Sequence, residues 1–264
     1  MAPTPPTRKG PPAPSWFTAA VLGDDLRELL GPRIPVHTGA QTSAEAQLDD
    51  CLRAREQAGA RVLDLGCGAG DSIDLFRRLA PDARWSGVDI DESPEVAMRA
   101  RDDGDFHTFD GERLPFGDAE FDVVWCKQVL EHVETPRTLL TEVARVLRPG
   151  GVLIGSTSQL EPFHSRSTAN PTPYGLSLAL EAAGLRTTSI RPSIDSLTLI
   201  ARRAVGGGAF FDRWWTRESP VNRAIDLYAR VRGLEPAAVS AAKLVLCGQF
   251  VFAAERPSAG QPEA

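Results

Sequence analysis

The sequence lacks the features that would place it in a membrane or around a metal ion. No apolar run approaches the roughly 20 residues that a bilayer-spanning helix requires, and the opening stretch MAPTPPTRKGPPAPS has no apolar signal core. The four cysteines are far apart, form no CxxC pair and have no histidine at a metal-ligand spacing. We therefore expect reduced thiols, no bound metal and a cytoplasmic location.

Lysine is also scarce, and almost all of the positive charge is carried by arginine. Lysine occurs only as Lys9, Lys127 and Lys243, and the chain carries a net charge of -6. Such a chain has no broad electrostatic attraction for the phosphates of nucleic acids or for anionic membranes. We therefore expect neither nucleic acid nor a membrane as a partner. The sequence leaves the oligomeric state open.

Length and composition indicate one principal α/β domain with additions. The chain has 264 residues, of which 42% are hydrophobic and 24% are charged. The first fourteen residues hold too much proline for a helix or a strand. We divide the chain into a disordered lead-in at 1–14, an N-terminal helical cap at 15–60, a core at 61–192, a helical insertion at 193–242, a last core strand at 243–256 and a tail at 257–264.

Short apolar runs alternate with helix-length segments from residue 61 onward, which is typical of βαβ units and a mostly parallel sheet. In two of these runs, 123–125 and 152–154, consecutive apolar residues indicate strands that are covered on both faces. We expect strands at 61–65, 84–89, 105–110, 121–126, 151–157, 186–191 and 246–255, with helices between them.

The stretch VLDLGCGAGDS, at 62–72, places three glycines at alternate positions directly after the first strand. A parallel sheet binds ligands beyond the carboxyl ends of its strands, and glycine there permits positive φ and a close approach of ligand to backbone. The pattern G-x-G-x-G differs from the dinucleotide fingerprint G-x-G-x-x-G, and Asp71 is unfavourable beside a pyrophosphate. A nicotinamide-dependent oxidoreductase is therefore a disfavoured alternative.

Carboxylates follow the strands beside this turn. Asp89 ends the second expected strand, where its side chain can accept hydrogen bonds from both hydroxyls of a ribose. Asp110 ends the third and is followed by Gly111, while Asp64 and Asp71 favour a ligand that carries positive charge. Together these residues describe a slot for an adenosine with a short polar tail.

Four segments, VLDLGCGAG, GVDID, FDGERLPFGDAEFDVVWCKQVLEHV and VLRPGGVLIGSTS, resemble in order and spacing the signature segments of class I S-adenosylmethionine-dependent methyltransferases. The resemblance covers roughly 61–158 and is greatest to the small-molecule branch that includes ubiquinone-pathway enzymes. It implies S-adenosylmethionine (SAM) as the cofactor. It also implies an α/β fold with a Rossmann-like seven-stranded methyltransferase sheet, mostly parallel with an antiparallel last strand and with helices on both faces.

The resemblance assigns roles to individual residues. Asp64 and the glycine turn would hold the methionine part of the cofactor, and Asp89 would bind its ribose. Ile90 would pack on the adenine, whose edge Asp110 and the backbone of Gly111 would contact. The full set of candidate cofactor residues is Asp64, Gly66, Cys67, Gly68, Gly70, Asp89, Ile90, Asp110, Gly111, Cys126 and Lys127.

Cys126 and Lys127, at the end of the fourth expected strand, would face the methionine end of the cofactor. Lys127 is a departure from the family pattern. A lysine there could repel the sulfonium or pair with the cofactor carboxylate, and pairing is physically easier.

The implied reaction is methyl transfer to a small organic acceptor, with oxygen favoured over nitrogen or carbon, as in an O-methyltransferase of biosynthetic metabolism. Removal of a hydroxyl proton is helped by a general base, for which histidine is the usual side chain. The candidates are His164, on the loop after the fifth strand, and His132, after the fourth. No single base stands out, so a non-catalytic SAM-binding or scaffold protein with the same fold is the main alternative.

The helical insertion contains a segment rich in aromatic residues, AFFDRWWTRESPVNRAIDLYARVRG, at 209–233. Aromatic side chains at helical spacing commonly belong to a core. An inserted segment just before the last strand would, on the resemblance, lie near the acceptor. We interpret the insertion as an acceptor lid, with core packing as the alternative.

Overall fold

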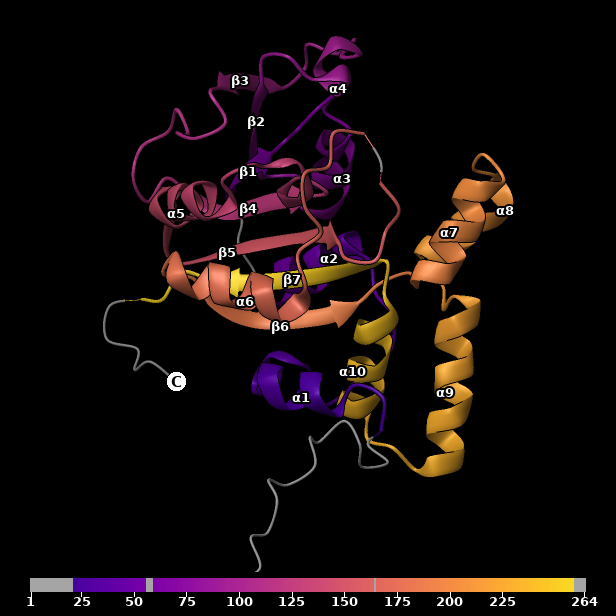
Figure 1. The fold of residues 1–264 in the computed structure, drawn as a ribbon. Coiled ribbons are helices and arrows are strands. Elements are labelled where there is room, and N and C mark those ends of the chain that lie inside the picture. The colour runs from indigo at the N-terminus through magenta and orange to yellow at the C-terminus, as the bar shows by residue number, and fades with distance from the viewer. Residues whose placement is uncertain (1–20, 56–58, 164, 259–264) are drawn as a thin grey trace, which may run out of the picture.

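A computed structural model of the protein describes residues 21–55, 59–163 and 165–258, and it shows a seven-stranded sheet between two layers of helices (Figure 1). The strand order is β3-β2-β1-β4-β5-β7-β6. β7 runs antiparallel to both of its neighbours, and the other adjacent strands are parallel. The expected methyltransferase sheet with an antiparallel last strand is therefore confirmed. The expected lead-in at 1–14 lies outside the described residues.

Each expected strand is present, with differences only at its ends. The strands are β1 (Arg61–Leu65), β2 (Arg84–Ile90), β3 (Asp105–Phe109), β4 (Phe121–Lys127), β5 (Leu147–Ser158), β6 (Arg186–Pro192) and β7 (Gln249–Glu255). β7 starts later than expected because helix α10 (Pro236–Leu246) extends to Leu246. β5 starts earlier because Leu147 pairs with Phe121 ahead of the Gly150–Gly151 pair.

The helices pack on the sheet through two apolar clusters. On one face, α1, α5, α6 and α10 pack against a cluster that includes Leu63 and Val124. On the other face, α2 and α3 pack against Val62 and Val123. Successive residues of β1 and β4 therefore enter opposite clusters, as expected for strands covered on both faces. The bounds of these helices are α1 (Asp24–Leu30), α2 (Ala44–Arg55), α3 (Ser72–Leu79), α5 (Pro136–Val146) and α6 (Pro173–Ala182).

The remaining helical elements are short or lie outside these layers. None of the helices in the described part of the chain has the length and hydropathy that crossing a membrane requires. These elements are α4 (Pro94–Ala97), α7 (Ser196–Ala204), α8 (Ala209–Asp212), α9 (Pro220–Arg232) and the 3-10 turns η2 (Gly31–Arg33), η3 (Leu130–His132) and η4 (Arg213–Trp215).

The strand order reverses between the neighbouring strands β1 and β4. From β1 it continues through β2 to β3 at one edge, whereas from β4 it continues to β5 on the other side. The connections that leave β1 and β4 therefore diverge, and a crevice opens beyond their carboxyl ends. The glycine turn lies at this position.

Residues 196–232, here called the arm, comprise α7, α8, η4 and α9 and stand beside the sheet (Figure 1). Polar contacts hold the arm. Lys243 of α10 is fully buried and pairs with Glu218 (Nζ–Oε1 3.0 Å) and with Asp226 of α9 (Nζ–Oδ1 2.8 Å). Gln41, in the loop before α2, donates a hydrogen bond to the carbonyl of Trp214 (2.6 Å). The arm is thus tied to both α10 and the N-terminal part of the chain.

Replacing Lys243 by methionine tests this attachment. The substitution keeps the length of the side chain but leaves Glu218 and Asp226 facing each other without their shared cation. We expect the free energy of unfolding, measured in urea, to fall by about 3 kcal/mol, the lower end for a broken buried ion pair. Arg53→Met is the control, because Arg53 pairs with Asp49 on an exposed helix surface and should change the free energy by less than about 0.5 kcal/mol. Equal effects of the two substitutions would contradict this account.

Candidate active site

The glycine turn joins β1 to α3 in a left-handed backbone. Gly66 and Gly68 have φ values of +73° and +49°, which a side chain would strain. A Cβ at Gly66 would also lie 2.5 Å from Cγ2 of Val129, so the turn packs closely on the segment after β4. From the other side, the Arg99 guanidinium donates two hydrogen bonds to the carbonyl of Gly68 (2.8 and 2.6 Å) and lies 4.1 Å from the centroid of the Phe106 ring. The turn is therefore fixed by protein contacts on both sides.

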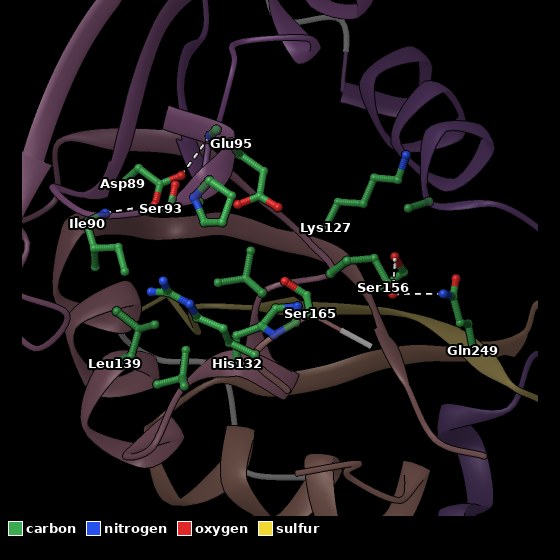
Figure 2. A pocket seen from close by; sticks show the side chains of 18 of the residues that line it. Asp89, Ile90, Ser93, Glu95, Lys127, His132, Leu139, Ser156, Ser165 and Gln249 are labelled. Atoms are coloured by element: carbon green, nitrogen blue, oxygen red, sulfur yellow. Dashed lines mark hydrogen bonds between the residues drawn. The ribbon is translucent and has the colours of Figure 1, made fainter. Parts of the chain in front are cut away.

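Asp89, near the end of β2, presents its carboxylate to the crevice (Figure 2). Its Oδ2 accepts a hydrogen bond from the backbone N–H of Gly68 (2.7 Å), and its Oδ1 accepts one from that of Ile90 (2.8 Å). Burial raises the pKa of this carboxyl, although the two backbone donors act in the opposite direction. Each oxygen retains a lone pair, so the carboxylate can accept two further hydrogen bonds from a diol.

The space beside Asp89 is bounded by apolar side chains. Ile90 is 40% exposed despite its hydrophobic side chain, and Leu139 of α5 lines the same region (Figure 2). Asp110 directly follows β3, and its Oδ1 accepts hydrogen bonds from the backbone N–H groups of Glu112 (2.9 Å) and Arg113 (2.8 Å). These bonds lower the pKa of the Asp110 carboxyl, so the side chain stabilises its own loop at the rim of the slot.

All these features line one cavity of about 1150 Å³ at the carboxyl edge of the sheet. Cys126 is not a lining residue because side chains alternate along a strand, so Cys126 packs into the core while Lys127 lines the cavity. The candidate cofactor residues that line the cavity are Gly66, Gly68, Asp89, Ile90, Asp110, Gly111 and Lys127. Those that are absent from its described lining are Asp64, Cys67, Gly70 and Cys126.

Asp64 is buried at the base of the glycine turn and accepts a hydrogen bond from the hydroxyl of Ser72. Burial raises the pKa of the Asp64 carboxyl to about 7, and the negative charges of Asp89 and Asp71 add to the effect while Ser72 opposes it. A cation that approached the turn would favour the ionised carboxylate. The electrostatics at this end of the cavity therefore suit a positively charged ligand.

Lys127 pairs with Glu45, in the first turn of α2 (Nζ–Oε1 2.5 Å). Burial opposes ionisation of Glu45, but the hydrogen bond and charge of Lys127 outweigh it and lower the pKa of the Glu45 carboxyl. Both side chains line the cavity. The pair therefore offers one negative and one positive group at the same wall, and Glu45 is a site residue that the sequence analysis missed.

The candidate bases are His132 and His164. His132, on η3, lines the cavity between Asp89 and Gln249 (Figure 2). His164 lies outside the described residues. His107, within β3, pairs with Asp105 (Nε2–Oδ1 3.0 Å) and does not line the cavity. Among the described residues, no group of three or more His, Cys, Asp or Glu side chains could hold a metal ion.

Beyond β4 the cavity becomes polar, which the sequence motifs did not indicate. Gln128 has a φ of +56°, unusual for a residue other than glycine, and lies directly after β4. Its amide donates to the hydroxyl of Ser156 (3.2 Å), and its Oε1 accepts from Nε2 of Gln249 (2.8 Å). Nε2 of Gln249 also donates to Glu161 (2.6 Å), which pairs with Arg203 of the arm (2.6 Å). We call this side of the cavity the polar compartment.

The raised pKa of Asp64 predicts a pH-dependent stability. Because the carboxyl titrates near pH 7 in the folded protein and near its ordinary value of 3.8 when unfolded, its contribution to stability falls as pH rises from about 4 to about 7. Asp64→Asn removes that loss. We expect the ligand-free variant to unfold like wild type at pH 4 and to be more stable at pH 8, by on the order of a few kcal/mol, in thermal unfolding.

Asp49→Asn is the matched control for this prediction. Arg53 holds the pKa of the exposed Asp49 carboxyl below its usual value, so this substitution should lower stability at neutral pH and lose its effect in acid. A difference between Asp64→Asn and wild type that did not vary from pH 4 to 8 would contradict the buried, protonated state of Asp64.

Comparisons with known proteins agree with this geometry. A family model described as "Methyltransferase domain" matches residues 63–155. A probable S-adenosylmethionine-dependent methyltransferase of Mycolicibacterium smegmatis is 33% identical over 184 residues, which cover 65% of this chain and 67% of that protein. A ubiquinone biosynthesis O-methyltransferase of Xanthomonas oryzae is 33% identical over 172 residues, 62% of this chain and 64% of that protein.

The fold is shared more widely. A methyltransferase solved in complex with the Trm112 methyltransferase activator of Haloferax volcanii superposes with a TM-score of 0.51 at 23% identity, over 83% of this chain and 97% of that one. This likeness concerns the fold alone. The chain thus matches about two thirds of the length of these curated relatives. The range that the family model matches includes the glycine turn and Asp89. It belongs to the family of S-adenosylmethionine-dependent methyltransferases.

Proposed function

We propose that the protein transfers a methyl group from SAM to a hydroxyl oxygen of a small organic acceptor. The observation that carries this proposal is the division of one cavity into an apolar slot beside Asp89 and the polar compartment beyond β4. The first part suits an adenosine, and the second offers hydrogen bonds to an acceptor with hydroxyl groups. That the Xanthomonas relative is called an O-methyltransferase supports oxygen as the acceptor atom.

The residues at the glycine turn fit SAM. Asp89 has two carboxylate oxygens with free lone pairs for the ribose hydroxyls, and Ile90 offers an apolar surface to the adenine. A Cβ at Gly68 would lie 2.9 Å from Cβ of Glu95, so the cradle admits only a bare backbone there. The buried carboxyl of Asp64 would be ionised more readily beside a cation.

Glu45 and Lys127 would bind the two charged groups of the amino acid part of SAM. Because the two side chains form an ion pair with each other, they can exchange that contact for an α-ammonium at Glu45 and an α-carboxylate at Lys127. The exchange keeps the charges of the wall balanced. The nearby negative charge of Glu45 would also reduce the repulsion between Lys127 and the sulfonium.

When bound, SAM would supply a methyl group on a sulfonium to the acceptor oxygen; the electron pair of the broken C–S bond would remain on sulfur, and the acceptor proton would pass to a base. The protein aligns the acceptor and keeps water away from it. We assign the proton to His132, whose ring lines the cavity between the two compartments (Figure 2). The arm contributes Arg203 and Trp215 to the lining, so we propose it as the outer wall of the acceptor compartment.

Calorimetry with two ligands tests the cofactor assignments. S-adenosylhomocysteine contains the amino acid part, whereas 5′-methylthioadenosine lacks it. We expect Glu45→Gln and Lys127→Gln each to weaken S-adenosylhomocysteine binding about 10-fold and to leave 5′-methylthioadenosine binding unchanged. Asp89→Asn should weaken both ligands by about 10- to 100-fold, the scale of a charge-assisted hydrogen bond of about 1.5–3 kcal/mol.

Asp49→Asn, on the exposed part of α2, is the control and should leave both affinities unchanged. Parallel losses for both ligands in Glu45→Gln would refute the role given to that residue. No saturable binding of S-adenosylhomocysteine to folded wild type would refute the proposed function.

A pair of histidine variants tests the assignment of the base. With any acceptor that wild type methylates, we expect His132→Gln to lower kcat by roughly 100-fold or more and to leave S-adenosylhomocysteine affinity unchanged. His107→Gln changes a histidine of β3 that lies away from the cavity, and it should leave kcat unchanged. A His132→Gln enzyme with wild-type kcat would move the role to another group. Cofactor binding without turnover of any acceptor in an extract of the source organism would instead indicate a non-catalytic protein.

A further inference from the structure

We propose that the acceptor is a glycosyl unit, methylated on a ring hydroxyl, and that the polar compartment is a sugar-binding subsite. This inference rests on the proposed function, because it names the class of acceptor for the same reaction. It depends on the side chains that line the compartment beyond β4, which differ in kind from those of the adenosine slot.

The floor of the compartment is a connected set of amides and hydroxyls. Gln128 directly follows β4, and Ser156 and Gln249 belong to β5 and β7, the next two strands of the sheet. Hydrogen bonds of 3.2 and 2.8 Å join the three side chains (Figure 2). Both N–H groups of Gln249 are already donated to Gln128 and Glu161, and one N–H of Gln128 is donated to Ser156. A ring hydroxyl would therefore bond to Oε1 of Gln249 or to the second N–H of Gln128. The left-handed backbone of Gln128 is unusual for its residue type, and such strain is found where a side chain must be held for binding.

The wall of the compartment carries charge that is fixed in place. Glu161, which is 7% exposed, accepts hydrogen bonds from Ser158 (2.7 Å) and Gln249 (2.6 Å) and pairs with Arg203 (2.6 Å). Carboxylate and guanidinium groups held in this way present planar hydrogen-bonding edges that need little rearrangement to receive a ligand. A polyhydroxylated ligand can bond to such a wall at several points at once.

An aromatic side chain faces the same space. Trp215 of η4 lines the cavity, and the guanidinium of Arg202 lies 5.9 Å from its ring centroid. An indole offers a flat apolar surface together with an N–H donor, which suits the C–H face of a sugar ring whose hydroxyls point outward. One aromatic surface with an otherwise polar lining is a different arrangement from a slot built for a flat, largely apolar acceptor.

The burial of these polar groups argues against such an acceptor. Gln249, Ser156 and Glu161 are buried and hydrogen-bonded within the network, but their oxygens keep lone pairs that a hydrophobic ring would cover without offering a donor. Sites built to bond substrate hydroxyls reject analogues that lack them by large factors. The compartment therefore favours a glycosyl acceptor over a prenylated quinone precursor or a simple phenol.

Saturation-transfer NMR provides a test that does not depend on turnover. Protein saturated with S-adenosylhomocysteine is mixed with methyl glycosides of glucose, galactose and mannose, with UDP-glucose, and with catechol. We expect transfer to the ring protons of at least one hexose and none to catechol. The signal should be lost in Trp215→Ala and in Gln249→Leu, and retained in Trp215→Phe. Methyl transfer to the same panel, followed with isotope-labelled SAM, should select the same hexose by at least 100-fold over catechol.

Trp214→Ala is the matched control. Trp214 neighbours Trp215 and does not line the cavity, although it contacts Arg213 and Arg223 of the arm. This variant should keep the hexose signal, so equal losses in both tryptophan variants would overturn the sugar subsite. All variants are first checked for wild-type affinity for S-adenosylhomocysteine, which separates a lost subsite from a misfolded protein.

The outcomes separate the two proposals. Binding and methylation of catechol, with no hexose signal, would overturn the glycosyl acceptor and leave an O-methyltransferase standing. Failure to bind S-adenosylhomocysteine would overturn the proposed function itself. Absence of a signal from every hexose and from UDP-glucose, in protein loaded with S-adenosylhomocysteine, would also overturn the sugar subsite.

Discussion

The divergence of the chain between β1 and β4 is the constraint on which the site depends. Because the strands from β1 to β5 are parallel, their carboxyl ends share one edge of the sheet, and the reversal of strand order keeps the loops apart at that edge. Glycines after β1 then let the backbone approach a ligand, and Asp89 holds the turn through the N–H of Gly68. The same carboxylate faces the cavity, so one side chain both shapes the turn and is available to a diol.

The part of the site that could be predicted from the sequence is local. The glycine turn, Asp89 and Ile90 follow their strands directly, so strand periodicity places them at the edge without knowledge of the packing. Periodicity does not show which of two adjacent residues at the end of a strand faces the cavity. Cys126 and Lys127 are adjacent, yet one packs into the core and the other lines the cavity, and a motif that names both cannot decide between them.

The rest of the site joins residues that are distant in sequence, and no spacing rule links them. Glu45 meets Lys127 across 82 positions, and Gln249 meets Gln128 across 121. These contacts depend on where α2 packs and on β7 entering between β5 and β6. β7 also begins later than the sequence predicts. Helix α10 continues to Leu246, and its end depends on how the helix packs rather than on a local sequence pattern. A residue such as Gln249 has no local signal of function, because its partners Gln128 and Glu161 are distant in sequence.

The two halves of the cavity differ in how freely they can change. In the half that we propose for the adenosine, the turn is fixed by backbone geometry and by Arg99, so a substitution there would disturb the fold together with the proposed site. In the polar compartment, the hydrogen-bonding groups belong to side chains that satisfy one another when no acceptor is present, which limits the cost of burying them. The arm completes this half and is attached through Lys243 and Gln41, away from the lining residues. The side chains of the polar compartment can therefore vary while the sheet and the glycine turn keep their structure, which is why the family motifs identify the methyltransferase family and carry no information on the compartment that we propose for the acceptor.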